Sequence, residues 1–214
     1  GEIYNFLELR VDLVKEGFVF SGDSDTEVLL NLYLKYGPEM LPLLNGIFAF
    51  AILDLSLETL FIARDSLGVK PLYFSSEGNI FCFASEIKAL FELNSINKEV
   101  DLEAINRYLA FLWCPGEGTP IKSVKKLAPG EALIVKSGEI VKQWQWFQLP
   151  IFKGQSKDLG KKEAISETTN KLRQAVHRQM ISDVPLGAFL SGGLDSSSVV
   201  AFARELNPDI KCFT

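Results

Sequence analysis

The feature that most constrains the fold is a strand that turns into a helix through two adjacent glycines. Residues 185–190 form an apolar run typical of a buried strand, residues 194–206 have helical spacing, and residues 210–213 form a second apolar run. A strand, a helix and a strand in this order predict a βαβ unit, because two parallel strands need a crossover of this length. We therefore expect the end of the chain to begin a parallel sheet flanked by helices.

The loop between that strand and that helix has the composition of a phosphate-binding turn. Gly192 and Gly193 let consecutive amides approach a ligand without side-chain obstruction. The helix that follows directs its free amides and the positive end of its dipole to the same point. A tight turn without a ligand is the alternative, but the full Ser-Gly-Gly-Leu-Asp-Ser-Ser string favours a phosphate or pyrophosphate site. The residues expected to form it are Leu190, Ser191, Gly192, Gly193, Asp195, Ser196 and Ser197.

Residues 1–150 are organised differently, with short helical patterns and β-hairpins. Helices are expected at 5–16, 24–36, 85–93 and 101–113, a short strand at 18–20, and hairpins at 46–64, 72–84 and 131–143. Ser24 and Glu27 have the spacing of a capping box, in which each side chain caps a backbone amide of the other. The run at 47–53 is apolar on both faces, so we expect both faces of that strand to be covered.

Composition and charge exclude several classes of protein. The chain is 47% hydrophobic and 23% charged, which is typical of a globular protein. A net charge of −5, from 22 basic and 27 acidic residues, argues against nucleic acid or an anionic membrane as a partner. No apolar run approaches the ~20 residues that cross a bilayer. Three cysteines are few and odd in number, which favours a reducing, cytoplasmic location.

A change of composition divides the chain into two expected domains. Residues 150–162 hold four lysines, two glycines and no strand pattern, which predicts a linker between domains at 1–149 and 163–214. The chain starts at Gly1 rather than at methionine, and its last residues read as a strand interrupted within the element. We therefore expect an internal piece of a longer protein.

Two sets of motifs resemble known enzyme families. The loop at 190–197 resembles the pyrophosphate loop of N-type ATP pyrophosphatases, and the preceding Ser-Asp-Val-Pro-Leu-Gly-Ala-Phe-Leu at 182–190 resembles the entry to the synthetase domain of glutamine-dependent asparagine synthetases. The first half is similar to class II glutamine amidotransferases. The matching segments are Gly-Glu-Ile-Tyr-Asn at 1–5, Ser-Asp-Thr-Glu at 24–27, Asn-Gly-Ile-Phe-Ala-Phe-Ala at 45–51, Ala-Arg-Asp at 63–65 and Phe-Ala-Ser-Glu-Ile-Lys-Ala-Leu at 83–90.

The resemblance implies a fold and an activity. The fold would be a four-layer α/β/β/α N-terminal-nucleophile glutaminase domain followed by the start of a parallel-sheet nucleotide-binding α/β domain. The activity would be asparagine synthesis from glutamine, aspartate and ATP. A cysteine releases ammonia from glutamine, and ATP with Mg²⁺ converts the aspartate side chain to an acyl-adenylate that ammonia attacks.

Residue by residue, the resemblance assigns three positions to the glutamine pocket. Gly1 matches the glycine whose backbone amide contributes to the oxyanion hole, and Glu2 and Asp25 match the carboxylates that hold the ammonium group of glutamine. The nucleophilic cysteine and the arginine segment that binds the glutamine carboxylate match no residue of this chain. Asp195 is expected to approach the phosphates through Mg²⁺.

Other reactive residues are expected to be structural. Cys82, Cys114 and Cys212 have no adjacent histidine, and His177 lies in a polar helical segment, which indicates a solvated or interface position. Arg64, Asp65 and Lys70 flank a turn and are expected to brace the sheet rather than touch substrate. Phenylalanines and tryptophans spaced two apart at 48/50, 81/83 and 144/146 indicate core packing.

The sequence leaves some alternatives open. A related amidotransferase acting on another carboxylate, for example in surface-glycan synthesis, would share these motifs, because the residues that select the acceptor are expected after position 214. A non-catalytic module that binds glutamine and ATP is a third reading, against which the intact loop at 191–197 argues. For the oligomeric state, a homodimer is the alternative to a monomer.

Overall fold

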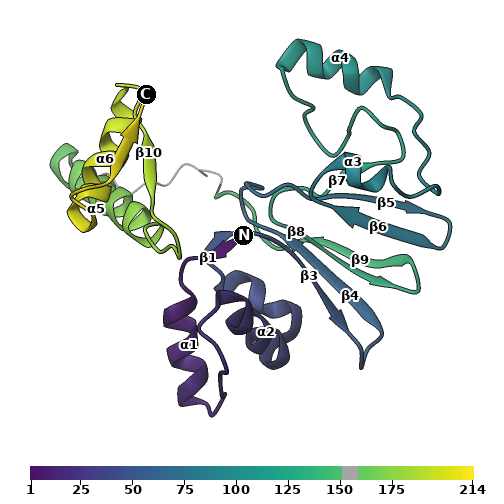
Figure 1. Cartoon of the computed structure of the whole chain (residues 1–214), viewed down its shortest axis with the longest axis horizontal. Helices are drawn as coiled ribbons and strands as arrows, with labels where there is room; N and C mark the ends of the chain where they lie inside the picture. The colour runs from purple at the N-terminus through teal and green to yellow at the C-terminus, as the bar shows by residue number, and fades with distance from the viewer. Residues whose placement is uncertain (151–158) are drawn as a thin grey trace. The chain divides into compact units, whose positions relative to one another are not determined.

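The computed structural model describes residues 1–150 and 159–214. It divides the chain into two compact units, Gly1–Leu149 and Pro150–Thr214. Figure 1 shows the helices and strands of each unit. Each unit has its own secondary structure and is described by itself.

The first unit contains a small number of helices and many short strands. In chain order its elements are β1 (Glu2–Ile3), α1 (Phe6–Lys15), α2 (Asp25–Tyr36), the 3-10 helix η1 (Gly37–Leu43), β2 (Gly46–Ile47), β3 (Ala49–Asp54), β4 (Thr59–Arg64), β5 (Tyr73–Glu77), β6 (Ile80–Ala84), α3 (Ile87–Leu90), α4 (Leu102–Phe111), β7 (Lys125–Lys126), β8 (Glu131–Lys136) and β9 (Glu139–Gln145). These elements include the three hairpins expected from the sequence.

Two antiparallel sheets form the centre of this unit. The larger has the strand order β3-β4-β8-β9, and the smaller has the order β6-β5-β7. β1 and β2 pair separately, with Ile3 opposite Gly46. Hairpin connections set the register of the pairs β3–β4, β5–β6 and β8–β9, whereas β4–β8 joins strands far apart in sequence.

Three apolar clusters show that the unit has four layers. The first joins Val28 and Leu32 of α2 to Phe61 of the larger sheet. The second lies between the sheets and includes Ile62 of β4 and Phe74 of β5. The third packs the smaller sheet against α3 and the segments after it, through Leu90, Ile96 and Val124. The order helix, sheet, sheet, helix is visible in Figure 1 and confirms the predicted α/β/β/α architecture.

The strand with both faces covered most completely is β4. Phe61 and Ile62 point to opposite faces of β4 and are 1% and 0% exposed. In β3, Leu53 is 64% exposed. The sheet that contains β3 is covered on both faces by the first and second clusters, as expected from residues 47–53. The cover does not reach the end of β3, because β3 is an edge strand whose last apolar residues approach the hairpin turn.

Three local expectations need correction. Residues 18–20 are not a strand, although Phe18 and Phe20 still pack on the first cluster. The helix expected at 85–93 is limited to Ile87–Leu90. Ser24 does accept a hydrogen bond from the Glu27 amide at 3.2 Å, but Glu27 accepts from the amides of Ser21 and Gly22 instead of reaching back to Ser24. The turn before the helix therefore supplies Glu27 with two backbone donors.

The second unit contains α5 (Lys161–Arg178), β10 (Gly187–Phe189), α6 (Leu194–Leu206) and β11 (Lys211–Phe213). β10 and β11 are parallel neighbours, with Ala188 opposite Cys212, which confirms the predicted βαβ unit. The strand expected to be buried is exposed on one face, where Phe189 is 87% exposed, because only α5 and α6 pack on this two-stranded sheet among the described residues.

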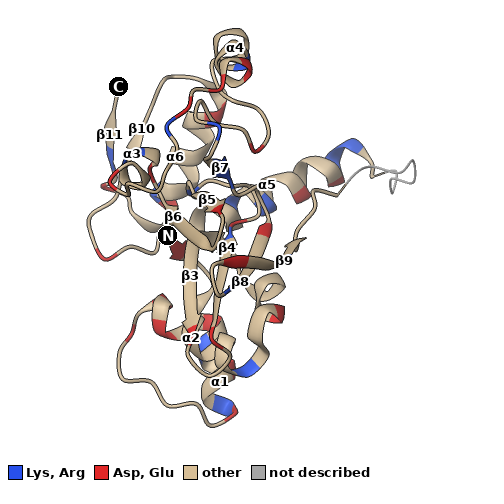
Figure 2. Ribbon diagram, turned by 90° about the vertical axis from the view of Figure 1, so that its right-hand side faces the viewer, with Lys and Arg blue, Asp and Glu red and all other residues tan. Residues whose placement is uncertain are grey.

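The predicted linker at 150–162 falls mainly on residues 151–158, which lie outside the described residues. Its last two residues, Lys161 and Lys162, already belong to α5. Figure 2 shows that both basic and acidic residues occur along α5. The described residues contain no helix long and apolar enough to span a membrane.

Candidate functional site

The first candidate site begins where β1 lies against β2. Glu2 is opposite Ile47 and Ile3 is opposite Gly46 in this antiparallel pair. A Cβ atom built on Gly1 would lie 2.7 Å from the carbonyl oxygen of Ile47 and 2.8 Å from Cα of Phe48. The backbones therefore approach more closely than a side chain at position 1 allows, which accounts for glycine there.

Asp25 is placed beside this strand by the start of α2. Ser24 is the N-cap residue, so Asp25 occupies the first helical position, where a carboxylate is favoured by the helix dipole. Its Oδ2 accepts a hydrogen bond from the backbone amide of Ile3 at 3.0 Å. Its Oδ1 lies 3.3 Å from the hydroxyl of Thr26, which donates to it. The carboxylate is thus fixed between the helix and β1.

The structure brings all three predicted glutamine-pocket residues to one small opening. The pocket has a volume of about 150 Å³. Its lining residues are Gly1, Glu2, Ile3, Asp25, Thr26, Leu29, Phe48, Ala49 and Phe50. Leu29 and Phe48 contribute apolar surface to this opening. The two carboxylates provide acceptors suited to an ammonium group.

The wall that contains Phe48 is held in place by Asp65, a buried carboxylate that is 1% exposed. Oδ2 of Asp65 accepts from the amides of Phe48 at 3.2 Å and Lys70 at 3.0 Å. Its Oδ1 accepts from Leu67 at 3.1 Å and Val69 at 2.9 Å. Asp65 therefore joins the turn after β4 to the pocket wall, which confirms a bracing role.

Arg64 braces the same turn through its side chain. Its guanidinium donates to the carbonyl oxygens of Lys70 at 2.7 Å, Leu127 at 2.5 Å and Gly68 at 2.6 Å. Burial lowers the pKa of Arg64 from its ordinary value, although the group keeps three acceptors. Trp146 donates from Nε1 to the Arg64 carbonyl at 3.1 Å and stacks on Phe48. These contacts are structural, as expected from the sequence.

Tyr4 and Asn5 belong to a segment that resembles the amidotransferases, but the sequence assigned them no role. The side chain of Asn5 donates to the carbonyl oxygen of Leu43 at 2.9 Å and accepts from the backbone amide of Asn45 at 2.9 Å. The pKa of Tyr4 is raised, mainly by burial and then by the negative charges of Glu2 and Asp65. Asn5 lies directly before α1, and its side chain joins the end of β1 to the segment before β2.

The second candidate site is the loop between β10 and α6. Gly192 has φ +77°, the left-handed region that favours glycine, and Gly193 is the N-cap residue of α6. The hydroxyls of Ser191 and Ser196 are 3.1 Å apart, and Ser196 also donates to the carbonyl of Gly193 at 3.2 Å. The predicted loop residues are therefore gathered at the start of the helix.

The free donors at this point are the first amides of α6. The amide of Ser197 is the first that bonds within the helix, to the carbonyl of Gly193 at 3.1 Å. The amides of Leu194, Asp195 and Ser196 precede it and lack a helical acceptor. The arrangement can bind an anionic group through amides and the serine hydroxyls.

Gly193 does not have a backbone conformation that requires glycine. Its φ of −74° suits any residue, and a Cβ built there would have only the Ser191 hydroxyl nearby, at 3.6 Å. The conformational requirement lies at Gly192 instead. A side chain at Gly193 would matter only through the space that it takes from a ligand.

Asp195 is the residue of this loop that fits a metal ion. Its carboxylate is exposed and accepts no hydrogen bond among the described residues. Those residues hold no group of three His, Cys, Asp or Glu side chains able to bind a metal by themselves. Magnesium commonly uses one or two carboxylates together with phosphate oxygens, so Asp195 fits Mg²⁺ carried by a nucleotide.

His177 lies between the two helices of the second unit. Its Nε2 is 3.1 Å from Oε2 of Glu205 and 3.1 Å from the carbonyl of Phe202. Arg173 donates to both oxygens of Glu205, at 3.1 and 3.0 Å. The histidine therefore holds a position at the α5–α6 interface, as predicted.

Both units of the chain match models of known protein families. Residues 167–214 match the family model for asparagine synthase. Asparagine synthetase (glutamine-hydrolyzing) 1 of Bacillus subtilis is 39% identical over 217 residues, covering 100% of this chain and 33% of the relative. Putative asparagine synthetase (glutamine-hydrolyzing) 2 of Methanocaldococcus jannaschii is 41% identical over 220 residues, covering 100% and 41%. The chain thus spans about a third to two fifths of the length of these relatives.

A solved structure of glutamine phosphoribosylpyrophosphate amidotransferase from B. subtilis aligns with 99% of this chain and 43% of its own, with 18% identity and a TM-score of 0.49. Residues 1–146, more than half of the chain, match the family model for the glutamine amidotransferase domain. The chain belongs to the glutamine amidotransferase domain family.

Proposed function

We propose that this chain is part of a glutamine-hydrolysing asparagine synthetase, with a glutaminase domain at 1–149 and the start of an ATP-binding synthetase domain at 163–214. The observation that carries the proposal is the convergence of Gly1, Glu2 and Asp25 on one opening, in a chain that also keeps the loop at 190–197. The names of the two relatives and the two family models support the same reading.

In the first domain, the chain's own residues bind and orient glutamine. The carboxylates of Glu2 and Asp25 hold the α-ammonium group, and this orients the side-chain amide relative to β1. The backbone nitrogen of Gly1 stabilises the negative oxygen that develops when a nucleophile attacks the amide carbon. Leu29 and Phe48 exclude water from the apolar side of the opening.

In the second domain, the loop binds the phosphates of ATP. The side-chain carboxylate of aspartate attacks the α-phosphorus, and pyrophosphate leaves. Ammonia then attacks the acyl carbon of the adenylate, and AMP leaves with the oxygen. The phosphate oxygens are held by the amides at the start of α6 and by the hydroxyls of Ser191, Ser196 and Ser197. Leu190 follows β10 directly and positions the loop. Mg²⁺, held by Asp195, supplies charge neutralisation when bound.

The proposed substrates are glutamine, aspartate and ATP, with Mg²⁺, and the proposed location is the cytoplasm. The test measures pyrophosphate release by the protein with the flanking sequence that its gene encodes, in the presence of glutamine, ATP and one acceptor acid at a time. Aspartate should stimulate release well above other carboxylic acids. Equal stimulation by another acid, or none by aspartate, would assign the chain to a different amidotransferase.

A further inference from the structure

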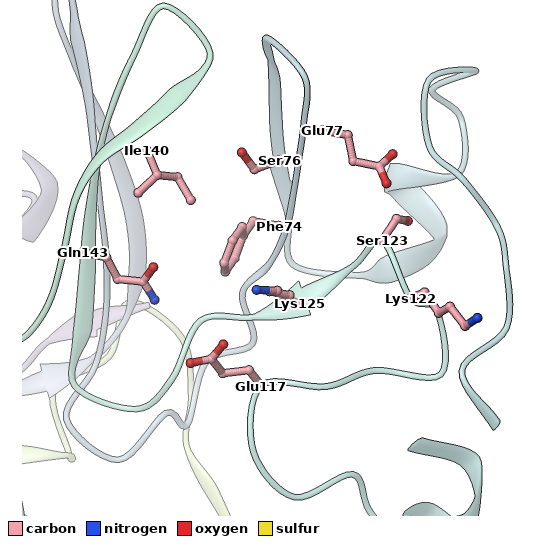
Figure 3. A pocket seen from close by; sticks show the side chains of 9 residues that line it. All are labelled: Phe74, Ser76, Glu77, Glu117, Lys122, Ser123, Lys125, Ile140 and Gln143. Atoms are coloured by element: carbon pink, nitrogen blue, oxygen red, sulfur yellow. The ribbon is translucent and has the colours of Figure 1, made fainter. Parts of the chain in front are cut away.

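A second opening in the first unit lies at the edge between its two sheets and belongs to neither candidate site. It has a volume of about 360 Å³, within the range of about 300–1,000 Å³ typical of small-molecule pockets. Residues of β5 and β9 and of the segment that leads into β7 line it. Figure 3 shows the side chains around it.

The floor of the opening is apolar. Phe74 of β5 is 4% exposed and stacks on Phe81, with ring centroids 5.8 Å apart. Ile140 of β9 lies beside it, on the neighbouring sheet. A ligand that enters this opening would place an uncharged, apolar group against Phe74 and Ile140.

Two opposite charges are turned toward the same opening. Lys125 belongs to β7, and Glu117 lies on the segment that runs antiparallel to it, where the Lys126 amide donates to the Glu117 carbonyl at 2.8 Å. Among the described residues, neither side chain forms an ion pair or a hydrogen bond, and they do not pair with each other. Lys122 and Glu77 extend away from the opening in Figure 3, and Lys122 pairs with Glu99.

A third polar group at the opening has a fixed orientation. Gln143 of β9 donates from Nε2 to Oε1 of Glu131 at 2.6 Å. Glu131 is itself 8% exposed and accepts from the Ala128 amide at 2.9 Å. Because the Gln143 nitrogen is committed to Glu131, the amide oxygen is the atom that remains to accept a hydrogen bond at the opening.

We propose that this opening binds a small zwitterion, an α-amino acid with an apolar side chain of about leucine's size. Its carboxylate would meet Lys125, its ammonium group would meet Glu117 and the oxygen of Gln143, and its side chain would lie on Phe74 and Ile140. A phosphate would be repelled by Glu117, and a simple cation by Lys125. The proposal does not depend on the proposed function, because no residue of this opening lines the pocket at Gly1.

The experiment is calorimetric titration of the 214-residue chain with L-leucine, and with two analogues that each lack one charge: 4-methylpentanoate and 3-methylbutylamine. Leucine should bind at millimolar concentrations, and each analogue at least about tenfold more weakly, as expected for the loss of a charged hydrogen bond. Lys125→Met and Glu117→Gln should each weaken leucine binding by about tenfold or more.

Lys122→Met and Glu77→Gln are the matched controls, because both residues border the opening while their charged ends extend away from it. They should leave the affinity within about twofold of the unsubstituted chain. Thermal unfolding of each variant shows whether it is folded. No leucine binding, equal binding of an analogue, or equal losses in the controls would each overturn the proposal.

Discussion

The carboxylate of Asp25 accepts a hydrogen bond from the backbone amide of Ile3, with 3.0 Å between Oδ2 and the nitrogen. This bond joins the first turn of α2 to the strand that carries Gly1 and Glu2, although the residues are 22 positions apart. Asp25 therefore contributes both to the shape of the pocket and to its charge. An experiment on Asp25 must separate these two contributions.

We expect Asp25→Asn to raise the KM for glutamine by about 10- to 100-fold in the full-length protein, because a hydrogen bond to a charged group contributes about 1.5–3 kcal/mol. Synthesis with free ammonia as nitrogen donor should change much less. The asparagine oxygen can still accept from the Ile3 amide, so the substitution removes charge and keeps the local contact. The measurement is steady-state kinetics with each donor.

Asp23→Asn is the control for this experiment, since Asp23 precedes α2 but its side chain is 96% exposed and does not line the pocket. It should leave both KM values near those of the unsubstituted protein. An equal loss of activity with glutamine and with ammonia in Asp25→Asn would show that Asp25 acts only through folding.

Gly46→Ala should destabilise the first unit by about 1–3 kcal/mol, the usual cost of an overpacked site. A Cβ atom at position 46 would overlap the carbonyl oxygen of Glu2 and lie 2.9 Å from Cα of Ile3. The β1–β2 pair would have to separate. Urea unfolding measures the change, and Gly22→Ala is the matched control, because its nearest neighbour would be a Glu27 side-chain oxygen at 3.4 Å. Equal stabilities of the two variants would contradict the close approach of β1 and β2.

The contribution of Glu27 to stability should depend on pH. Hydrogen bonds from the amides of Ser21 and Gly22 hold the pKa of Glu27 below its ordinary value of 4.5. A carboxyl group whose pKa is lower in the folded protein stabilises the fold above its unfolded pKa, and this stabilisation is lost as pH falls through the folded pKa. The difference in free energy of unfolding between the unsubstituted chain and Glu27→Gln should be constant near neutral pH and shrink below about pH 4.5.

Urea unfolding measures this difference between about pH 7 and about pH 3, the range that includes the titration of carboxyl groups. Glu139→Gln serves as the control, because Glu139 starts β9 and its carboxylate accepts no hydrogen bond among the described residues. A difference for Glu27→Gln that stays the same at every pH would show that the two amide bonds do not favour the charged form.

Gly193→Val and Asp195→Asn should each abolish ATP-dependent synthesis and leave glutamine hydrolysis largely intact. The valine would occupy the space beside the Ser191 hydroxyl, and the asparagine would lose the negative charge that suits Mg²⁺. The φ of −74° at Gly193 allows valine without backbone strain, so the variant tests ligand space rather than folding. Pyrophosphate release and glutamate release are measured on each variant. Near-normal pyrophosphate release in either one would make the loop a structural turn.

Local patterns predicted the elements well, because each depends on neighbouring residues. The apolar spacing of α2, the Ser24 cap and the loop before α6 were all readable from the sequence. The pairing of β4 with β8 and the depth of burial of each strand depend on residues far apart in the chain, so the exposed end of β3 was not predicted. The role of Asn5 was missed for the same reason, since both partners of its side chain lie about 40 residues away.

The proposed function requires that nitrogen from glutamine is transferred to aspartate in an ATP-dependent reaction. The most direct test supplies the full-length protein with glutamine labelled with ¹⁵N in its side-chain amide, together with aspartate, ATP and Mg²⁺, and follows the label by NMR. We expect ¹⁵N in the side-chain amide of asparagine, dependent on ATP and aspartate and reduced in Asp25→Asn. Label that appears only as free ammonium, or in the amide of another acid, would contradict it.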